Sequence, residues 1–116
     1  MNSSFPKRGD IWLVNFNPGR GSEQKGIRPA LILQNDTGNE YAATTIVAAI
    51  TSVIKLYPVT VLLKARASGL KKDSIVNLAQ ILTIDKNRLK KKIGSLDKDL
   101  MRKIDRSLCV SLDLSF

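Results

Sequence analysis

The sequence predicts a small, mainly β barrel with one short helix and a second helix at its C-terminal end. Three observations favour this fold: five short extended segments bounded by turn residues, an amphipathic final segment, and a length of 116 residues. That length is the size of one ordinary domain, and neither a repeat nor a long linker divides the chain. We therefore expect residues 1–116 to form a single domain.

The expected strands are runs of β-branched or alternating apolar residues. They cover residues 10–16, 30–34, 44–50, 58–64 and 75–84, with an interruption near residues 79–80 in the last. Pro29 is expected to open the second strand and to bias Arg28 toward an extended conformation, which places Arg28 at a loop-to-strand junction. Turn residues 35–39 follow that strand, and Thr51 lies at the end of the third.

Two helices complete the expected architecture. Asp85 is a suitable N-cap for a short helix through Lys91, with Gly94 as its stop, so the basic run 90–92 is assigned to this helix. Asp97 is a suitable N-cap for the last helix. Its apolar residues recur every fourth position, which predicts one face packed on the barrel: Leu100, Ile104, Leu108 and Leu112.

Composition excludes several classes of function. The chain has no histidine and one cysteine, Cys109, so one chain cannot assemble the usual zinc ligands, a disulfide or a His-based catalytic set. Neither a signal peptide nor a run of about 18 apolar residues is present, which predicts a cytoplasmic protein without a membrane segment.

The net charge is +9 with a pI near 10.0, which favours a polyanionic partner. The charge is uneven: residues 1–54 carry five basic and four acidic residues, whereas residues 55–116 carry fourteen and six. The run Lys90–Lys92, with Lys86 and Arg88, is a candidate phosphate-tracking face, although such runs are more often only solvated surface.

Short motifs follow one another along nearly the whole chain. In order, they are Lys7-Arg8-Gly9-Asp10-Ile11, Pro18, Gly21-Ser22-Glu23-Gln24, Gly26-Ile27-Arg28-Pro29, Gln34-Asn35-Asp36, residues 46–52, Gly69-Leu70, Asp73-Ser74, Gln80-Ile81 and residues 83–86. In order and spacing they resemble the MazF/PemK endoribonuclease toxins of type II toxin–antitoxin systems. The chain departs from that pattern around Gln80, where Ala79 and Leu82 replace an acidic residue and an arginine.

The resemblance implies an SH3-like barrel with a C-terminal helix, of the fold that MazF and CcdB toxins share. It also implies a homodimer with single-stranded RNA along the dimer interface. An acidic, partly disordered antitoxin would neutralise the toxin, in a complex that binds DNA. The implied activity is a sequence-specific endoribonuclease that needs no metal or cofactor.

The family's functional positions transfer onto particular residues of this chain. By resemblance, Arg28 and Thr51 are the catalytic residues. The positions that contact RNA in the family correspond to Ser22, Glu23, Gln24, Ser52 and Gln80.

A metal-free ribonuclease uses the 2′-hydroxyl of its own substrate as nucleophile, which DNA lacks. In-line attack on the adjacent phosphorus expels the 5′-oxygen and leaves a 2′,3′-cyclic phosphate and a 5′-hydroxyl. A guanidinium such as that of Arg28 suits this reaction because it binds two phosphate oxygens at once and stabilises developing charge. Which residue acts as general acid and which as base stays open, because neither Arg28 nor Thr51 exchanges protons readily near neutral pH.

Purely structural roles are the alternatives for the two catalytic candidates. Arg28 would form a salt bridge with Glu23 or Asp10, and the Thr51 hydroxyl would only satisfy a strand end.

Other functions of the protein also stay open at this point. A CcdB-like, gyrase-binding toxin has the same fold. That family relies on a tryptophan-bearing tail, whereas residues 113–116 here are Asp-Leu-Ser-Phe. A plain RNA-binding module would bind RNA without making product.

The aromatic residues of the first strand are interpreted as structural. Trp12 and Phe16 fit its regular alternation, so we expect them in the core or a dimer interface rather than as platforms for stacked bases.

Overall fold

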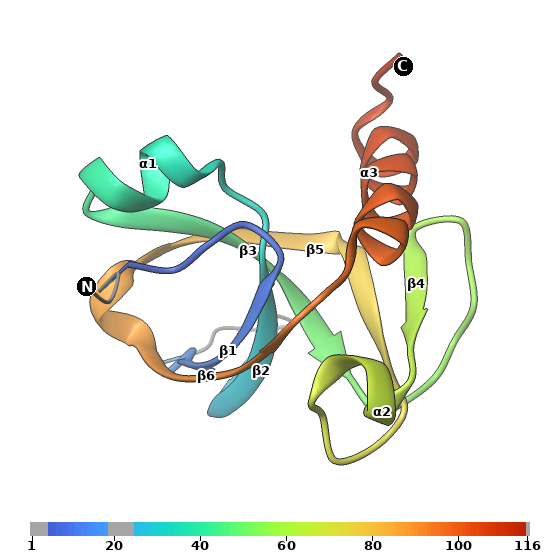
Figure 1. The fold of residues 1–116 in the computed structure, drawn as a ribbon, viewed down its shortest axis with the longest axis horizontal. Coiled ribbons are helices and arrows are strands. Elements are labelled where there is room, and N and C mark those ends of the chain that lie inside the picture. The colour runs from blue at the N-terminus through green and yellow to red at the C-terminus, as the bar shows by residue number, and fades with distance from the viewer. Residues whose placement is uncertain (1–4, 19–24, 116) are drawn as a thin grey trace.

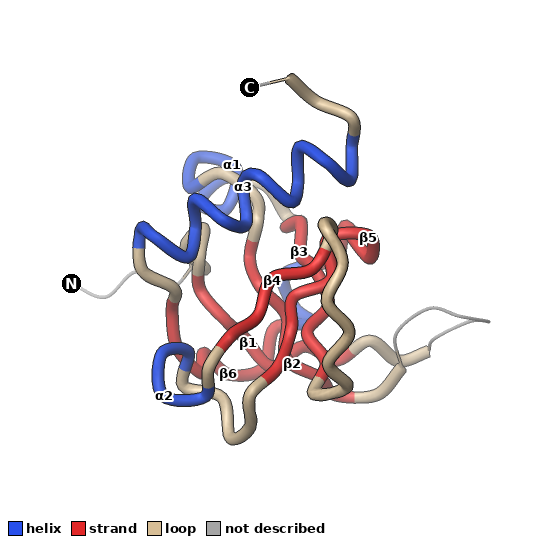
Figure 2. The backbone as a smooth tube through the Cα atoms, turned by 90° about the vertical axis from the view of Figure 1, so that its right-hand side faces the viewer, coloured by secondary structure: helices blue, strands red, loops and turns tan. Residues whose placement is uncertain are grey.

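The fold was examined in a computed structural model that describes residues 5–18 and 25–115. The strands are β1 (Asp10–Asn15), β2 (Ile27–Ile32), β3 (Thr44–Thr51), β4 (Thr60–Leu63), β5 (Ser74–Asp85) and β6 (Leu89–Ser95). The helices are α1 (Asp36–Tyr41), α2 (Ala65–Ser68), the 3₁₀ turn η1 (Lys86–Arg88) and α3 (Lys98–Leu112). Helices α1 and α3 lie at one end of the strands and α2 at the other (Figures 1 and 2).

The strands form one antiparallel sheet in the order β4-β5-β3-β2-β1-β6, which confirms the mainly β fold class with a C-terminal helix. β4 and β6 are its two edges, so the sheet is not closed by strand pairing. Instead α2, which follows β4, rests against β6. A Cβ on Gly94 would lie 2.3 Å from the carbonyl oxygen of Ser68, so only glycine permits this backbone contact.

The core forms two clusters on opposite faces of the sheet. Leu31 and Ile32 are adjacent in β2 and fully buried, and each belongs to a different cluster. The larger cluster receives α3 through Ile104, with Leu100 and Leu108 packed against it. Leu112, which we expected on this face, is 53% exposed, and its neighbour Ser111 instead attaches the last turn of α3 to β5 by donating to the Leu78 carbonyl at 2.6 Å.

The smaller cluster contains Phe16, which is buried, and receives half-buried Trp12 at its edge. The positions of both aromatic side chains thus support the predicted structural role.

The predicted N-cap of α3 is also confirmed, since the Asp97 carboxylate accepts a hydrogen bond from the N–H of Leu100. The predicted interruption of β5 is present as well: its pairing with β3 jumps from Ile81 to Asn77.

The short helix predicted from Asp85 through Lys91 is wrong. Only the 3₁₀ turn η1 forms there, and residues 89–95 become the edge strand β6. Lysine favours helices, but pairing with β1 overrides that preference. Two register shifts in this pairing interrupt the alternation of apolar residues, so the sequence shows no strand pattern.

Two further predictions need correction. Pro29 is the third residue of β2 rather than its first, and it pairs with Leu13 of β1, whereas pairing with β3 begins only at Ala30. A proline is tolerated there because its missing N–H has a strand neighbour on one side only. The turn expected over residues 35–39 is the start of α1, since the Asn35 side chain caps that helix by accepting from the N–H of Gly38.

A buried polar network fastens α1 to the sheet. Asn39 is fully buried, and its side-chain oxygen accepts from Thr45 Oγ1 at 2.7 Å and from Gln34 Nε2 at 3.1 Å. The backbone N–H of Arg8 donates to the Asp36 carboxylate at 2.7 Å, which ties the chain before β1 to the same helix. Across the part of the chain that the structure describes, none of the helices has the length and apolarity needed to span a membrane.

Candidate catalytic pocket and nucleic-acid interface

An open pocket of about 590 Å³ brings Arg28, Thr51 and Ser52 together. Arg28 is the second residue of β2 and Thr51 is the last residue of β3, so these antiparallel neighbours present them at one end of the sheet. The pocket is completed by the loop between α2 and β5 and by β6. Leu13 of β1 lines it as well, so residues from five separate segments of the chain share one wall.

Of the two salt bridges considered above for Arg28, the one with Asp10 does not form. Arg28 Nε donates to the backbone carbonyl of Lys25 at 3.1 Å, which holds the base of the exposed guanidinium. The Asp10 carboxylate binds elsewhere: it accepts from the N–H of Lys7 at 2.8 Å and pairs with Lys92 Nζ at 3.4 Å. The other suggested partner, Glu23, lies outside the described residues.

Thr51 does satisfy its strand end, because its hydroxyl oxygen accepts from the N–H of Val53 at 3.1 Å. A hydroxyl that accepts one bond keeps its own hydrogen for donation and a second lone pair. The capping role and a role toward a phosphate are therefore compatible.

The predicted RNA-contacting residues divide into three groups. Ser52 is exposed on the pocket wall beside Thr51. Gln80 is half-buried at the irregularity of β5 and does not line the pocket. Ser22, Glu23 and Gln24 lie outside the described residues.

The two ends of the segment that carries Ser22 to Gln24 are held together. The N–H of Phe16 donates to the Gly26 carbonyl, and the Asn17 side chain accepts from the N–H of Gly26. Arg88 Nη1 donates to the carbonyls of Asn15 and Asn17 at 3.0 and 2.6 Å. Arg88, predicted as part of a phosphate-tracking face, instead binds backbone at the base of this loop.

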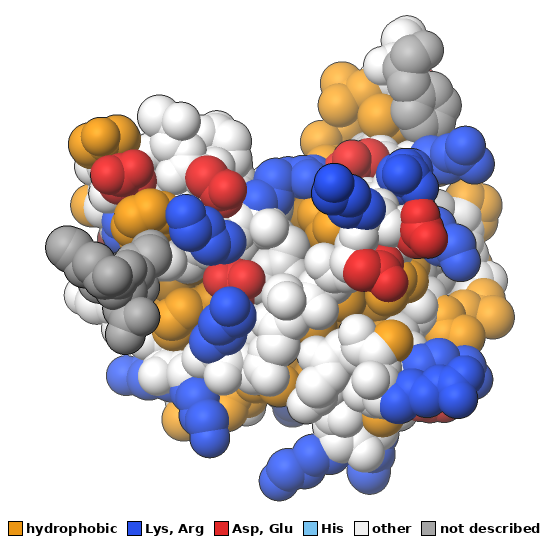
Figure 3. Space-filling view, in the orientation of Figure 1, with side chains coloured by type: hydrophobic (Ala, Val, Ile, Leu, Met, Phe, Trp, Pro, Cys, Tyr) orange, Lys and Arg blue, Asp and Glu red, His pale blue; other side chains and the backbone are white. Residues whose placement is uncertain are grey.

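Sequence reasoning missed Lys71, which lines the pocket together with Lys91 and Lys92. The charge of residues 90–92 indicated a phosphate-binding face, although the run was assigned to a helix. Nothing in the sequence around Lys71 indicated a site, because only the order of the strands brings the α2–β5 loop beside β2 and β6. Figure 3 shows Lys and Arg side chains over much of its face, along the lower edge and also beside the carboxylates over α1 and α3.

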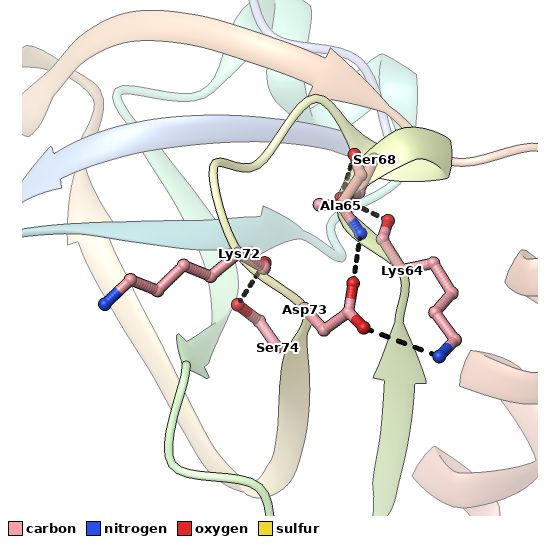
Figure 4. Close-up of polar contacts among 6 residues, drawn as sticks. All are labelled: Lys64, Ala65, Ser68, Lys72, Asp73 and Ser74. Atoms are coloured by element: carbon pink, nitrogen blue, oxygen red, sulfur yellow. Dashed lines mark hydrogen bonds and ion pairs between the residues drawn. The ribbon is translucent and has the colours of Figure 1, made fainter.

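Figure 4 shows how the α2–β5 loop is fastened. The Asp73 carboxylate accepts from the N–H of Ala65 at 2.8 Å and pairs with Lys64 Nζ at 3.4 Å. The Ala65 hydrogen bond, and then the Lys64 ammonium, lower the pKa of Asp73 below its ordinary value. Ser68 Oγ donates to the Lys64 carbonyl at 2.9 Å, which stabilises the single turn of α2.

Comparisons with known proteins agree with this fold. A family model described as "PemK-like, MazF-like toxin of type II toxin-antitoxin system" matches residues 7–112. Endoribonuclease EndoA of Bacillus subtilis (strain 168) is 47% identical over 110 residues, which cover 93% of this chain and 95% of that protein.

Solved structures are also similar. MazF from Deinococcus radiodurans superposes with a TM-score of 0.83 at 26% identity, covering 97% of this chain and 100% of that one. A MazE–MazF structure from the same organism gives 0.76 at 25% identity, again over 97% and 100%.

The fold is that of the MazF-like toxins, and in this chain it carries an open pocket lined by cations. The chain belongs to the PemK-like, MazF-like family of type II toxins, because the family model spans nearly all of it and EndoA is 47% identical. The predicted family is thus confirmed, and these relatives favour an RNA-cleaving toxin over a CcdB-like, gyrase-binding one.

Proposed function

We propose that this protein is a sequence-specific endoribonuclease toxin that cleaves single-stranded RNA without a metal ion. The observation that carries the proposal is the shared pocket of Arg28 and Thr51, whose charged wall residues, among those described, are all cations. A phosphodiester is attracted to such a wall, and its transition state carries more negative charge on the phosphoryl oxygens than its ground state.

In this proposal Arg28 clamps the scissile phosphate. Its guanidinium donates hydrogen bonds to two phosphate oxygens at once. The 2′-hydroxyl of the preceding ribose attacks the phosphorus in line, and the 5′-oxygen leaves opposite it. The products are a 2′,3′-cyclic phosphate and a free 5′-hydroxyl.

Thr51 donates its hydroxyl hydrogen to a phosphate oxygen or orients the attacking 2′-hydroxyl. Its backbone is fixed by pairing with Ile75, and its hydroxyl is turned by the hydrogen bond from Val53, so little reorganisation is needed when RNA binds. Ser52 and the loop that contains Ser22, Glu23 and Gln24 contact neighbouring nucleotides, and Gln80 contributes from outside this pocket.

The partners follow from the family. We propose that the chain acts as a homodimer in the cytoplasm and that a cognate antitoxin inhibits it. MazF and MazE of D. radiodurans were solved as a complex, which supports an antitoxin partner here. A protein of charge +9 favours an acidic one, because opposite charge speeds association and covers the cations that RNA would bind.

The test is cleavage of a long single-stranded RNA and of the matched DNA by purified protein in EDTA, with the cut ends mapped. We expect discrete RNA cuts with 5′-hydroxyl ends and an intact DNA. Arg28→Ala should lose about 10³-fold or more in rate, as arginines that stabilise phosphoryl transfer do, and keep the melting temperature of the wild type.

Arg66→Ala is the matched control, because Arg66 is also exposed and does not line the pocket. It should cleave at the wild-type rate. Folded protein that leaves every RNA intact would refute the ribonuclease proposal, and RNA binding without product would reduce the pocket to a binding site.

A further inference from the structure

The catalytic pocket carries more positive charge than one scissile phosphate requires. Besides Arg28, its wall includes Lys71 from the α2–β5 loop and Lys91 from β6. Lys92 also lines the pocket, but its Nζ pairs with the buried Asp10 carboxylate at 3.4 Å. The described residues of the wall include no carboxylate. The positive charges of Lys71 and Lys91 can therefore attract an anion that enters the pocket.

Lys71 sits on a backbone that is held on both sides. Before it, Gly69 adopts φ +82° and presses against the Ile93 carbonyl of β6, while the Leu70 side chain packs on the larger core cluster. After it, Asp73 binds the N–H of Ala65 (Figure 4). Because this backbone is already ordered, only the side chain of Lys71 has to lose conformational freedom when it binds a ligand.

Lys91 is placed by the register of three strands. It pairs with Leu13 of β1, and Leu13 pairs on its other side with Pro29, next to Arg28 on β2. Lys91 and Pro29 are therefore two strand spacings apart, about 10 Å. Apolar Leu13 lies between them on the same wall, which reduces the local dielectric and strengthens attraction for an anion.

We propose that Lys71 and Lys91 bind the backbone phosphates that neighbour the scissile phosphate in the RNA strand. The inference rests on the proposed function of Arg28 and Thr51. Because an ammonium group binds phosphate as a point charge, these contacts add affinity and position the strand without reading its bases. They bind substrate and transition state equally, so their loss changes KM rather than kcat.

The test is steady-state cleavage by Lys71→Ala, Lys91→Ala and the double variant, on the RNA that the wild type cuts, from 50 to 300 mM KCl. At 150 mM we expect KM to rise about fourfold for each lysine, with kcat unchanged. The slope of log(1/KM) against log[KCl] should become shallower by about 0.7 per lysine. Lys71→Arg and Lys91→Arg keep the charge and should restore both quantities.

Lys72→Ala and Lys98→Ala are matched controls. Each removes the same charge from an exposed lysine, and neither residue lines the pocket. Their KM and salt slope should follow the wild type, and all variants are first compared in melting temperature.

A second measurement locates the contacts on the strand. An RNA whose linkage next to the cut site is an uncharged methylphosphonate should already lack one of these contacts. The loss from Lys71→Ala or Lys91→Ala on that substrate should then be smaller than on the natural strand, because both changes remove the same interaction.

The two proposals fail in different ways. If the wild type cleaves no RNA, both fall. If the wild type cleaves and the Lys71 and Lys91 variants match their controls, or lose kcat at constant KM, only the phosphate contacts proposed here are overturned.

Discussion

At the scale of single residues, the motifs that mark the family serve two different purposes. Gln34, Asn35 and Asp36 build the scaffold: Gln34 Nε2 donates to the Thr44 carbonyl, Asn35 caps α1, and Asp36 accepts from the N–H of Arg8. Arg28 and Thr51 instead line an open pocket. The family motifs therefore identify the fold as much as the chemistry, and only the structure separates the residues that serve each.

Thr51 permits a test that isolates its hydroxyl. Thr51→Val keeps the shape of the side chain and removes the donor, so we expect kcat to fall by roughly 10²-fold, the effect of deleting one hydrogen bond to a developing charge. Thr51→Ser keeps the hydroxyl and should retain most of the activity. Single-turnover cleavage measures both, and equal rates for the two variants would contradict a role for the hydroxyl.

Arg28 and Thr51 were predictable because each lies inside a contiguous motif whose neighbours fix its environment. Lys71 was not, since it becomes part of the pocket only through the order of the strands, which places β2 and β6 on either side of β1. A pocket wall built from distant segments leaves no local pattern in a sequence.

At the scale of elements, predictions held where local pattern and tertiary packing agree. α3 has its cap and its apolar stripe, and all five predicted strands lie within a few residues of their predicted ranges. They failed at 85–91, where lysines and a capping aspartate favour a helix but β1 offers a strand partner. α2 has only four residues and no apolar period, so only its contact with β6 reveals its function in the fold.

The contact between α2 and β6 depends on Gly94. Its substitution by alanine would place a Cβ 2.3 Å from the Ser68 carbonyl oxygen, and a backbone atom has no easy way to withdraw. We expect Gly94→Ala to lower the free energy of unfolding by about 1–3 kcal/mol, the range for overpacking. Urea denaturation measures the loss, with exposed Ser95→Ala as a neighbouring control that should unfold like the wild type.

The α2–β5 loop gives the protein a defined pH dependence. Because the Ala65 N–H and Lys64 lower the pKa of Asp73, its carboxylate contributes stability that is complete above the ordinary aspartate pKa of about 3.9 and is lost as the pH falls through its lower, folded value. Asp73→Ala should therefore be less stable than the wild type from pH 7 to pH 5, and this difference should shrink below pH 4.

Urea titrations at pH 7, 5 and 3 would follow the Asp73 effect. Glu40→Ala, which removes an exposed carboxylate of α1, is the control and should show a smaller difference at pH 7. A stability gap between Asp73→Ala and the wild type that widened toward pH 3 would contradict the assignment.

At the scale of the whole molecule, one asymmetry organises the protein. Helices α1 and α3 close one end of the strands (Figures 1 and 2), while the pocket is lined by the ends of β2 and β3, by the α2–β5 loop and by β6. The charged residues that line the pocket, among those described, are all cations, so they would attract the RNA of the proposed function.

The proposed homodimer can be tested by its molecular mass in solution. One chain is 12.8 kDa, so a dimer is 2 × 12.8 = 25.6 kDa. We expect light scattering coupled to gel filtration to give the dimer mass at micromolar concentration and 300 mM KCl, where charge repulsion between chains of +9 is screened. A mass of 12.8 kDa throughout would contradict a dimer as the working form.

The position of β6 gives its lysines a further consequence. β6 is an edge strand that α2 and Gly69 cover only at Ile93 and Gly94, and the N–H and C=O groups of an edge strand are a template on which another chain's strand could assemble. Lys90, Lys91 and Lys92 place three like charges along this edge, so a second copy that aligned its own β6 there would meet strong repulsion. The charge that draws a polyanion to this side of the molecule thereby also keeps sheets of separate molecules from joining into aggregates.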